Sequence, residues 1–184
     1  LHLNFSLIKN GENLYLENGL SREAESFLEG MLRHIKNSSA VTNPLINSYK
    51  RFVDGFGAPT KIGWSAEEKS AVVKLDHYNQ CFELRTPDAA CNPYLCLALM
   101  TEAGLEGMRD LLPLSEDLSM DSSAAERMPD SLYGALLYMK EDPLVRSVLG
   151  ETIFRQYLRA KLAEWNDYNT TVHQWEINKY LNVF

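Results

Sequence analysis

The chain has 184 residues, of which 45% are hydrophobic and 23% charged, an ordinary composition for one globular domain with a substantial core. Its 18 basic and 25 acidic residues give a net charge of -7, which argues against nucleic acid or an anionic membrane as a partner. There is no run of 18 apolar residues and no signal-peptide pattern at the start, so we expect no membrane span and a cytoplasmic location. The three cysteines have no metal-type spacing and are expected to be reduced.

The first part of the chain predicts short strands around one clear helix. Residues 2–7 alternate like a strand, and 13–16 form a second short strand after a turn. Apolar residues recur at helical spacing between Ser21 and Lys36, with glutamates early and basic residues late, which indicates a helix. The segment 42–59 is rich in Asn, Gly and Pro and is expected to be mostly loop. Strands are then predicted at 60–64, 70–75 and 80–86, the last two joined as a hairpin by residues 76–79.

The second part predicts helices. Pro93 is placed to open a helix that extends to about residue 112, and a polar surface loop follows. Further helices are expected at 132–140, from Pro143, and at 151–168, before an aromatic tail at 172–184. The tail either closes the domain's own core or contacts another subunit. Strands followed by helices, without βαβ alternation, define an α+β class built on an antiparallel sheet, in one domain spanning residues 1–184.

Polar residues on the strands and in the long loop are the candidates for chemistry. Glu83 and Arg85 alternate with Phe82 and Leu84, so both are expected on one face of their strand. A carboxylate and a guanidinium side by side can bind a cation and an anionic substrate, or they can form an ordinary solvated pair. The residues alone leave both interpretations open. The histidines His34, His77 and His173 have no partner at ligand spacing and are expected at the surface or at helix caps.

Several ordered blocks resemble the glutamine synthetase family. The order and spacing of all the blocks agree, and the resemblance runs from Leu1 to the aromatic tail. The blocks are His2 to Leu7, Thr42-Asn43-Pro44, Asn47 to Arg51, Gly55 to Pro59, Glu83 to Asp88, and Asn92 to Leu95.

This resemblance implies ligation of glutamate and ammonia at the expense of ATP, with Mg²⁺ or Mn²⁺, in a homo-oligomer that forms a dodecamer in the family. It implies that His2 and Glu83 are metal ligands and that Arg51 and Arg85 hold glutamate and the transferring phosphoryl group. Ser6 falls at a nucleotide-contacting position. The resemblance also implies that further metal-ligating glutamates lie upstream of this segment, and that a neighbouring subunit completes each site.

The sequence departs from the family pattern at several positions that the resemblance marks as functional. Asn4 replaces a second histidine, and Gly57 replaces a glutamate that helps to form the ammonium site. Lys69 and Lys74 stand where phosphate-binding arginines belong, and Cys81 stands at a third arginine position. Lysine keeps the positive charge but lacks the bidentate fork of arginine.

These departures leave three functions open. The first is a glutamine synthetase of which this segment is inactive alone, with Lys69, Lys74 and Ser6 binding the nucleotide. The second is a γ-glutamyl–amine or polyamine ligase, because Gly57 leaves room for a bulkier amine. The third is a degenerate homologue that binds without catalysis, suggested by Asn4, Gly57 and Cys81 together.

Overall fold

The computed structural model describes residues 1–16, 19–53, 58–181 and 183. Four strands form the main sheet in the order β1-β8-β7-β6, and two small antiparallel ladders pair β2 with β3 and β4 with β5. The strands are β1 (Leu3–Phe5), β2 (Ile8–Lys9), β3 (Glu12–Asn13), β4 (Tyr15–Leu16), β5 (Gly19–Leu20), β6 (Lys61–Ser65), β7 (Ala71–Asp76) and β8 (Cys81–Leu84). The helices are α1 (Arg22–Ile35), α2 (Ser39–Thr42), the 3₁₀ helix η1 (Ile46–Arg51), α3 (Pro93–Arg109), α4 (Leu132–Glu141), α5 (Pro143–Thr170) and α6 (Gln174–Tyr180).

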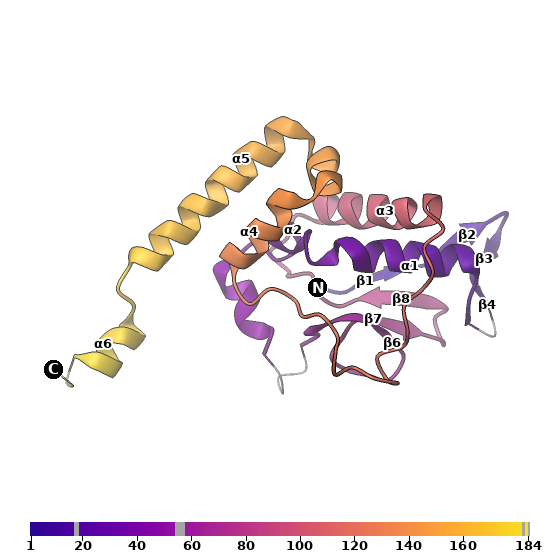
Figure 1. Cartoon of the computed structure of the whole chain (residues 1–184), viewed down its shortest axis with the longest axis horizontal. Helices are drawn as coiled ribbons and strands as arrows, with labels where there is room; N and C mark the ends of the chain where they lie inside the picture. Colours follow the sequence, from indigo (N-terminus) through magenta and orange to yellow (C-terminus); the bar gives the residue numbers. More distant parts are fainter. Residues whose placement is uncertain (17–18, 54–57, 182, 184) are drawn as a thin grey trace.

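The helices α1 and α3 cover one face of the main sheet (Figure 1). Phe82 of β8 is buried on this face, stacks on Phe5 of β1 with ring centroids 5.7 Å apart, and meets Phe27 of α1 at 6.0 Å. Leu84 of β8 lies opposite Val73 of β7, and both are fully buried. Because successive strand residues point to opposite faces, the residues between these apolar positions face away from the helices.

The helices α1 and α3 approach so closely that their backbones touch. A Cβ atom on Gly30 would lie 2.2 Å from the carbonyl oxygen of Ala103, and one on Gly107 would lie 2.1 Å from the carbonyl oxygen of Ser26. The Ser26 hydroxyl donates a 2.8 Å hydrogen bond to the Leu112 carbonyl just beyond α3. Only glycine permits this approach, so these two positions determine how the helical layer packs.

The α+β class with a helical C-terminal half is confirmed, but the sheet is mixed. The pairs β1–β8 and β7–β8 are antiparallel, including the predicted hairpin, whereas β6 and β7 run parallel. Only residues 66–70 connect these two parallel strands, which is short for such a connection. This short connection is sufficient because β6 has only five residues, so the chain has only a short distance to return before β7 begins beside the start of β6.

The predicted helices largely match the observed ones. The helix expected from Ser21 is α1, whose N-cap Ser21 accepts a 3.2 Å hydrogen bond from the Ala24 N–H. The predicted break before residue 151 is confirmed, because Gly150 has φ of 72° and interrupts α5. The expected loop 42–59 differs, since α2 ends at its start and η1 lies within it. Gly57 lies outside the described residues.

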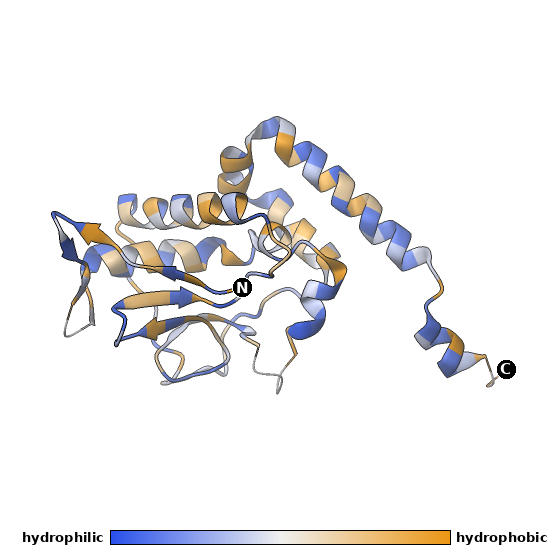
Figure 2. Cartoon of the chain, turned by 180° about the vertical axis from the view of Figure 1, so that it is seen from behind, coloured by the Kyte–Doolittle hydropathy of each residue, from blue (hydrophilic) through white to orange (hydrophobic). Residues whose placement is uncertain are grey.

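The second half of α5 extends away from the body and leads to α6 (Figure 1), and hydrophobic and hydrophilic residues alternate along it (Figure 2). Trp175 and Tyr180 are 64% and 47% exposed, so in this chain they do not close the core. Phe184 lies outside the described residues. Within the described part of the chain, no helix combines the length and apolar character needed to cross a bilayer.

His34 departs from the expected surface position, because it is buried at the junction of α1, α3 and α5. Its Nδ1 is 2.7 Å from Asp142 Oδ2 and its Nε2 is 2.8 Å from Glu106 Oε1. Both ring nitrogens face carboxylates, which only accept hydrogen bonds when ionised, so the ring is an imidazolium. Burial alone lowers the pKa of His34, but the hydrogen bonds to Asp142 and Glu106 raise it overall. Asp142 also caps α5 by accepting from the Leu144 N–H at 2.8 Å.

We expect Gly107→Ala to reduce the free energy of unfolding by about 1–3 kcal/mol, because the added methyl forces the α1 and α3 backbones apart. Gly134→Ala in α4 is the matched control, since its Cβ meets side-chain atoms and no backbone, the nearest being the Ser131 hydroxyl at 3.3 Å. That variant should be neutral or stabilised by up to about 1 kcal/mol through helix propensity. Urea denaturation followed by circular dichroism measures both. Equal effects of the two substitutions would contradict close helix packing.

We expect stability to fall as the pH rises above about 6.5, because the raised pKa of His34 means that its charged form stabilises the fold and is lost as the pH rises through that pKa. On the acid side, burial opposes the charged form of Asp142, but hydrogen bonds from His34 and Asn37 lower its pKa, so its contribution is lost only at low pH. His34→Gln should cost about 3 kcal/mol near pH 6 and remove the alkaline decline. His77→Gln, at an exposed position, is the control in pH-dependent urea titrations. If the stability of His34→Gln fell with rising pH as that of the unmodified chain does, His34 would not be the group responsible.

Candidate active site

The face of the sheet turned away from α1 and α3 carries the polar residues singled out in the sequence. Asn4 of β1, Glu83 of β8 and Lys74 of β7 stand in one row across the sheet, as the strand register fixes. A hollow of about 450 Å³ opens over this face, which we call the site hollow. Its walls are His2, Ala66, Glu67, Glu68, Lys69, Lys74, Glu83 and Arg85.

His2 and Glu83 are in direct side-chain contact in the site hollow, between His2 Nδ1 and Glu83 Oε1. The His2 side chain is 57% exposed and that of Glu83 is 20% exposed. An imidazole and a carboxylate are suitable ligands for Mn²⁺, and the carboxylate also suits Mg²⁺. Among the described residues, no group of three or more His, Cys, Asp or Glu side chains gathers to hold a metal. The pair therefore fits two positions of a metal's coordination and leaves the others to groups outside the described chain.

Arg85 fastens the 66–70 connection to β8. Its Nη1 donates hydrogen bonds to the carbonyl oxygens of Lys69 at 2.7 Å and Ala71 at 3.2 Å. Ser65 steadies the other end, because its buried hydroxyl accepts hydrogen bonds from the Glu67 and Glu68 N–H groups at 3.2 and 3.0 Å. Hydrogen bonds thus hold the connection at both ends, and Lys69 and Arg85 line the same hollow.

Three cationic side chains, Lys69, Lys74 and Arg85, line the site hollow. Cys81, which the resemblance places at a third arginine position, is buried, and burial raises the pKa of its thiol, with the nearby Asp76 and Glu83 adding to this effect. Its sulfur lies 4.0 Å from Asn4 Oδ1, so the two substituted positions are neighbours. A neutral thiol supplies no charge for an anion, which leaves the two lysines and Arg85 as the cations of the hollow.

Arg51 lies beside the site hollow but does not line it. Its guanidinium donates a hydrogen bond to the Thr86 carbonyl, directly after Arg85 in the chain. Burial lowers the pKa of Arg51, and Asp88 opposes this effect. Asp88 is half-buried, which disfavours its charge, yet hydrogen bonds from Ala90 and Ser48 and the charge of Arg51 lower its pKa.

Two buried side-chain atoms, Arg51 Nε and Thr86 Oγ1, have no hydrogen-bond partner among the described residues. Buried polar groups in folded proteins are nearly always paired, so these two atoms are exceptions among the described residues. The arrangement is compatible with the substrate-holding role that the family resemblance implies for Arg51.

Ser6 does not join the other predicted site residues. It follows β1 by one residue, and its hydroxyl lies 3.5 Å from the carbonyl oxygen of Gln80, at the hairpin end of the sheet. It lies four positions after His2 along extended chain, which corresponds to about 13 Å. A ligand that contacts both residues must therefore lie along β1, as an extended nucleotide would.

The structure thus brings together five of the seven predicted site residues and leaves Arg51 and Ser6 at its margins. Those five are His2, Lys69, Lys74, Glu83 and Arg85. Sequence reasoning missed Asp88 as the charge partner of Arg51 and Glu67 as a wall of the hollow. Asp88 follows Arg85 by three residues within one quoted block, so the block contained the signal. Glu67 had no such signal, because its place depends on the return of the chain after β6.

Comparisons with known proteins agree with this arrangement of an α+β domain that carries a charged site on its open sheet face. The family model described as "Glutamine synthetase, catalytic domain" matches residues 1–180. Glutamine synthetases from Clostridium saccharobutylicum and Thermus thermophilus are 39% and 41% identical over the whole chain. A solved structure, described as a GmaS/ADP complex, superposes on 98% of this chain with a TM-score of 0.82 and 33% identity, covering 45% of that protein.

The chain belongs to the glutamine synthetase family. It spans about 45% of the length of the two bacterial relatives.

We expect the 184-residue chain to bind Mn²⁺ weakly, with a Kd above about 0.1 mM, because only two candidate ligands lie together among its described residues. Glu83→Gln and His2→Gln should each weaken this binding about tenfold. Glu141→Gln, at an exposed position of α4, is the control. Electron paramagnetic resonance of free Mn²⁺ measures the affinities. If Mn²⁺ bound tightly and both Glu83→Gln and His2→Gln kept this affinity, the metal would bind at another place on the chain.

Proposed function

We propose that residues 1–184 are a C-terminal segment of the catalytic domain of an ATP-dependent ligase that joins glutamate and ammonia to form glutamine. The single observation that carries this proposal is the site hollow, in which His2 and Glu83 stand beside Lys69, Lys74 and Arg85. Membership of the glutamine synthetase family supports the reaction class, and the ADP in the related GmaS complex supports nucleotide binding on this scaffold.

The proposed chemistry needs charge neutralisation more than covalent catalysis, because phosphoryl transfer spreads negative charge over oxygen atoms. Lys69 and Lys74 neutralise phosphate oxygens as point charges, and Arg85 adds a planar donor held by two backbone carbonyls. Arg51 holds the substrate carboxylate from the margin, and Ser6 contacts the nucleotide farther along β1. Mg²⁺ or Mn²⁺, bound in part by His2 and Glu83, supplies further charge neutralisation.

We further propose that the chain alone does not complete this site. Two metal-ligand candidates meet among the described residues, and the polar atoms Arg51 Nε and Thr86 Oγ1 are buried without described partners. These features fit a site that other segments complete, including a neighbouring subunit of a homo-oligomer. The exposed aromatic residues of α6 are suitable for such a subunit contact.

A second candidate function is binding without catalysis. The observation that favours it is Cys81, whose buried thiol replaces a cation beside Glu83 and is paired with another substituted position, Asn4. The third candidate, a γ-glutamyl–amine or polyamine ligase, depends on Gly57, which lies outside the described residues, and it stays a prediction.

We expect the isolated chain to form no γ-glutamyl hydroxamate with ATP, glutamate, hydroxylamine and Mn²⁺, because its metal site is incomplete. The longer protein should form it and should release ADP with ammonia as the acceptor. Turnover by the isolated chain would contradict the incomplete site. ADP release by the longer protein with methylamine or polyamines, but not ammonia, would favour the amine ligase. Tight binding of ATP and Mn²⁺ without turnover on any acceptor would favour the non-catalytic homologue.

A further inference from the structure

A second cavity, larger than the site hollow, lies next to it and has no role in the proposed ligase chemistry. Its volume is about 730 Å³, and it shares Glu68 and Lys69 with the site hollow. The start of β6, the 66–70 connection and the segment between α3 and α4 form its walls. We call it the basic cavity, after the cations among its lining residues Lys61, Lys69, Ser70, Ser122, Ser123 and Arg127.

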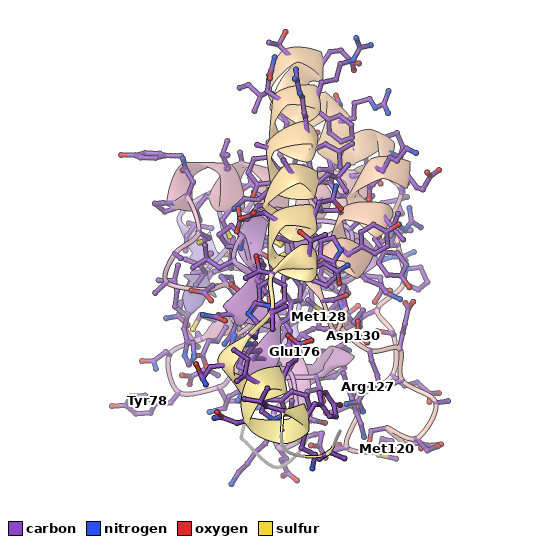
Figure 3. All side chains as sticks on the ribbon, turned by 90° about the vertical axis from the view of Figure 1, so that its left-hand side faces the viewer. Tyr78, Met120, Arg127, Met128, Asp130 and Glu176 are labelled. Carbon is purple, nitrogen blue, oxygen red and sulfur yellow. The ribbon has the colours of Figure 1, made fainter. Side chains whose placement is uncertain are left out.

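Backbone hydrogen bonds hold these walls together. Lys61 and Arg127 are directly opposed in an antiparallel bridge. Two backbone hydrogen bonds flank this bridge: the Ile62 N–H donates to the Glu126 carbonyl at 2.7 Å, and the Met128 N–H donates to the Thr60 carbonyl at 2.9 Å. On the other side, the N–H groups of Thr60 and Lys61 both donate to the Ser70 carbonyl at 2.9 Å. The basic cavity therefore lies between three segments that hydrogen bonds fix to one another. In Figure 3, Arg127 lies on the segment between α3 and α4, close to Met128.

The bridge places two cations close together. Directly opposed residues of an antiparallel pair have their Cβ atoms about 5 Å apart and their side chains on one face. Lys61 and Arg127 both line the basic cavity, so each contributes a positive charge to its wall. Positive charges on one wall attract an anion.

Hydroxyl groups add donors beside these cations. Lys61 Nζ donates a 2.7 Å hydrogen bond to the Ser122 hydroxyl oxygen, which leaves that hydroxyl's own proton for another acceptor. The Ser123 hydroxyl also lines the cavity. The Ser70 hydroxyl is buried and makes no well-formed hydrogen bond with a described residue, although the Glu68 carboxylate lies beside it.

The nearby carboxylates are already engaged by backbone N–H groups. Glu68 accepts from the Ser70 N–H at 2.8 Å, and Asp121 accepts from the Ser123 N–H at 2.8 Å. These bonds lower the pKa of both carboxyl groups, and the charge of Lys61 contributes. Among the described lining residues, three are basic and one is acidic, in a chain whose net charge is -7. The local charge thus opposes the overall charge.

We propose that the basic cavity binds the phosphate group of a small anion. A phosphate dianion matches several converging donors better than a monoanionic carboxylate does, because it has three acceptor oxygens and more charge. The volume exceeds that of one phosphate, so a phosphate-bearing molecule such as a nucleotide also fits. The proposal does not rest on ligase activity, because Lys61, Ser122 and Arg127 do not line the site hollow.

The test is a metal-free titration of the 184-residue chain with inorganic phosphate and, separately, with ADP, followed by calorimetry. Lys61→Gln removes a cavity cation, Lys74→Gln removes a cation of the site hollow, and Lys140→Gln in α4 is the exposed control. We expect Lys61→Gln to weaken binding about tenfold and Lys140→Gln to keep it, whereas Lys74→Gln, which alters the site hollow, should weaken binding less than Lys61→Gln does. If Lys61→Gln weakens the binding of both phosphate and ADP, the cavity is a general phosphate site. If it weakens the binding of ADP alone, the cavity is a nucleotide site.

Nuclear magnetic resonance of the unmodified chain gives a readout that does not depend on folding of the variant. Added phosphate or ADP should shift the backbone amide signals of Lys61, Ser122 and Arg127, and added sodium chloride should reverse the shifts. Absence of saturable binding up to about 10 mM would overturn the proposal. It would also be overturned if Lys74→Gln weakened binding while Lys61→Gln did not, because the anion would then occupy the site hollow.

Discussion

The contact between the backbones of α1 and α3 is the constraint on which the rest of the structure depends. Gly30 and Gly107 let the two helices touch, and Gly104 leaves room for the Phe27 ring, which a Cβ at that position would meet at 2.4 Å. Phe27 then reaches Phe82 on the sheet. The two helices thus form one thin layer whose side chains cover the apolar face of β1, β8 and β7. Dispersion and burial on this face fix the register of the strands.

The position of the candidate active site depends on which face of the sheet α1 and α3 cover. With Phe82 and Leu84 turned to the helices, strand alternation leaves Glu83 and Arg85 on the open face. The antiparallel pairing then brings Asn4 and Lys74 to either side of Glu83. A one-residue slip of register would bury these charges and expose the aromatic residues, so packing energy on one face maintains the chemistry on the other.

Local patterns in the sequence were sufficient for most elements. Ser21 before an amphipathic run predicted α1, the 76–79 turn predicted the β7–β8 hairpin, and the separate helices expected from Pro143 and at 151–168 correspond to the two parts of α5 on either side of Gly150. The family blocks predicted which residues share the site hollow, and their roles stay predictions. In each of these cases, the signal and the structure that it predicts lie within a few residues of one another or within one ordered motif.

What the sequence missed depends on contacts between distant residues. His34 is buried because Glu106 and Asp142, 72 and 108 positions away, meet it from α3 and from the start of α5. No spacing rule covers such separations. The parallel pairing of β6 with β7 was missed for a related reason, because short connections normally join antiparallel strands. The basic cavity went unnoticed because Lys61 and Arg127, which form its bridge, are 66 residues apart.

The 66–70 connection links the two charged regions of the molecule. Arg85 and Ser65 fix its ends, and Glu68 and Lys69 belong to both the site hollow and the basic cavity. An anion bound in either of the two would therefore lie next to a residue that lines the other, and Coulomb interactions between neighbouring charges are appreciable in a partly desolvated site. Because the connection is rigid, this influence is electrostatic and does not require the chain to move. Lys69 stands where the family resemblance implies an arginine, and lysine suits this arrangement, since a flexible point charge can serve either side, whereas a bidentate fork commits to one.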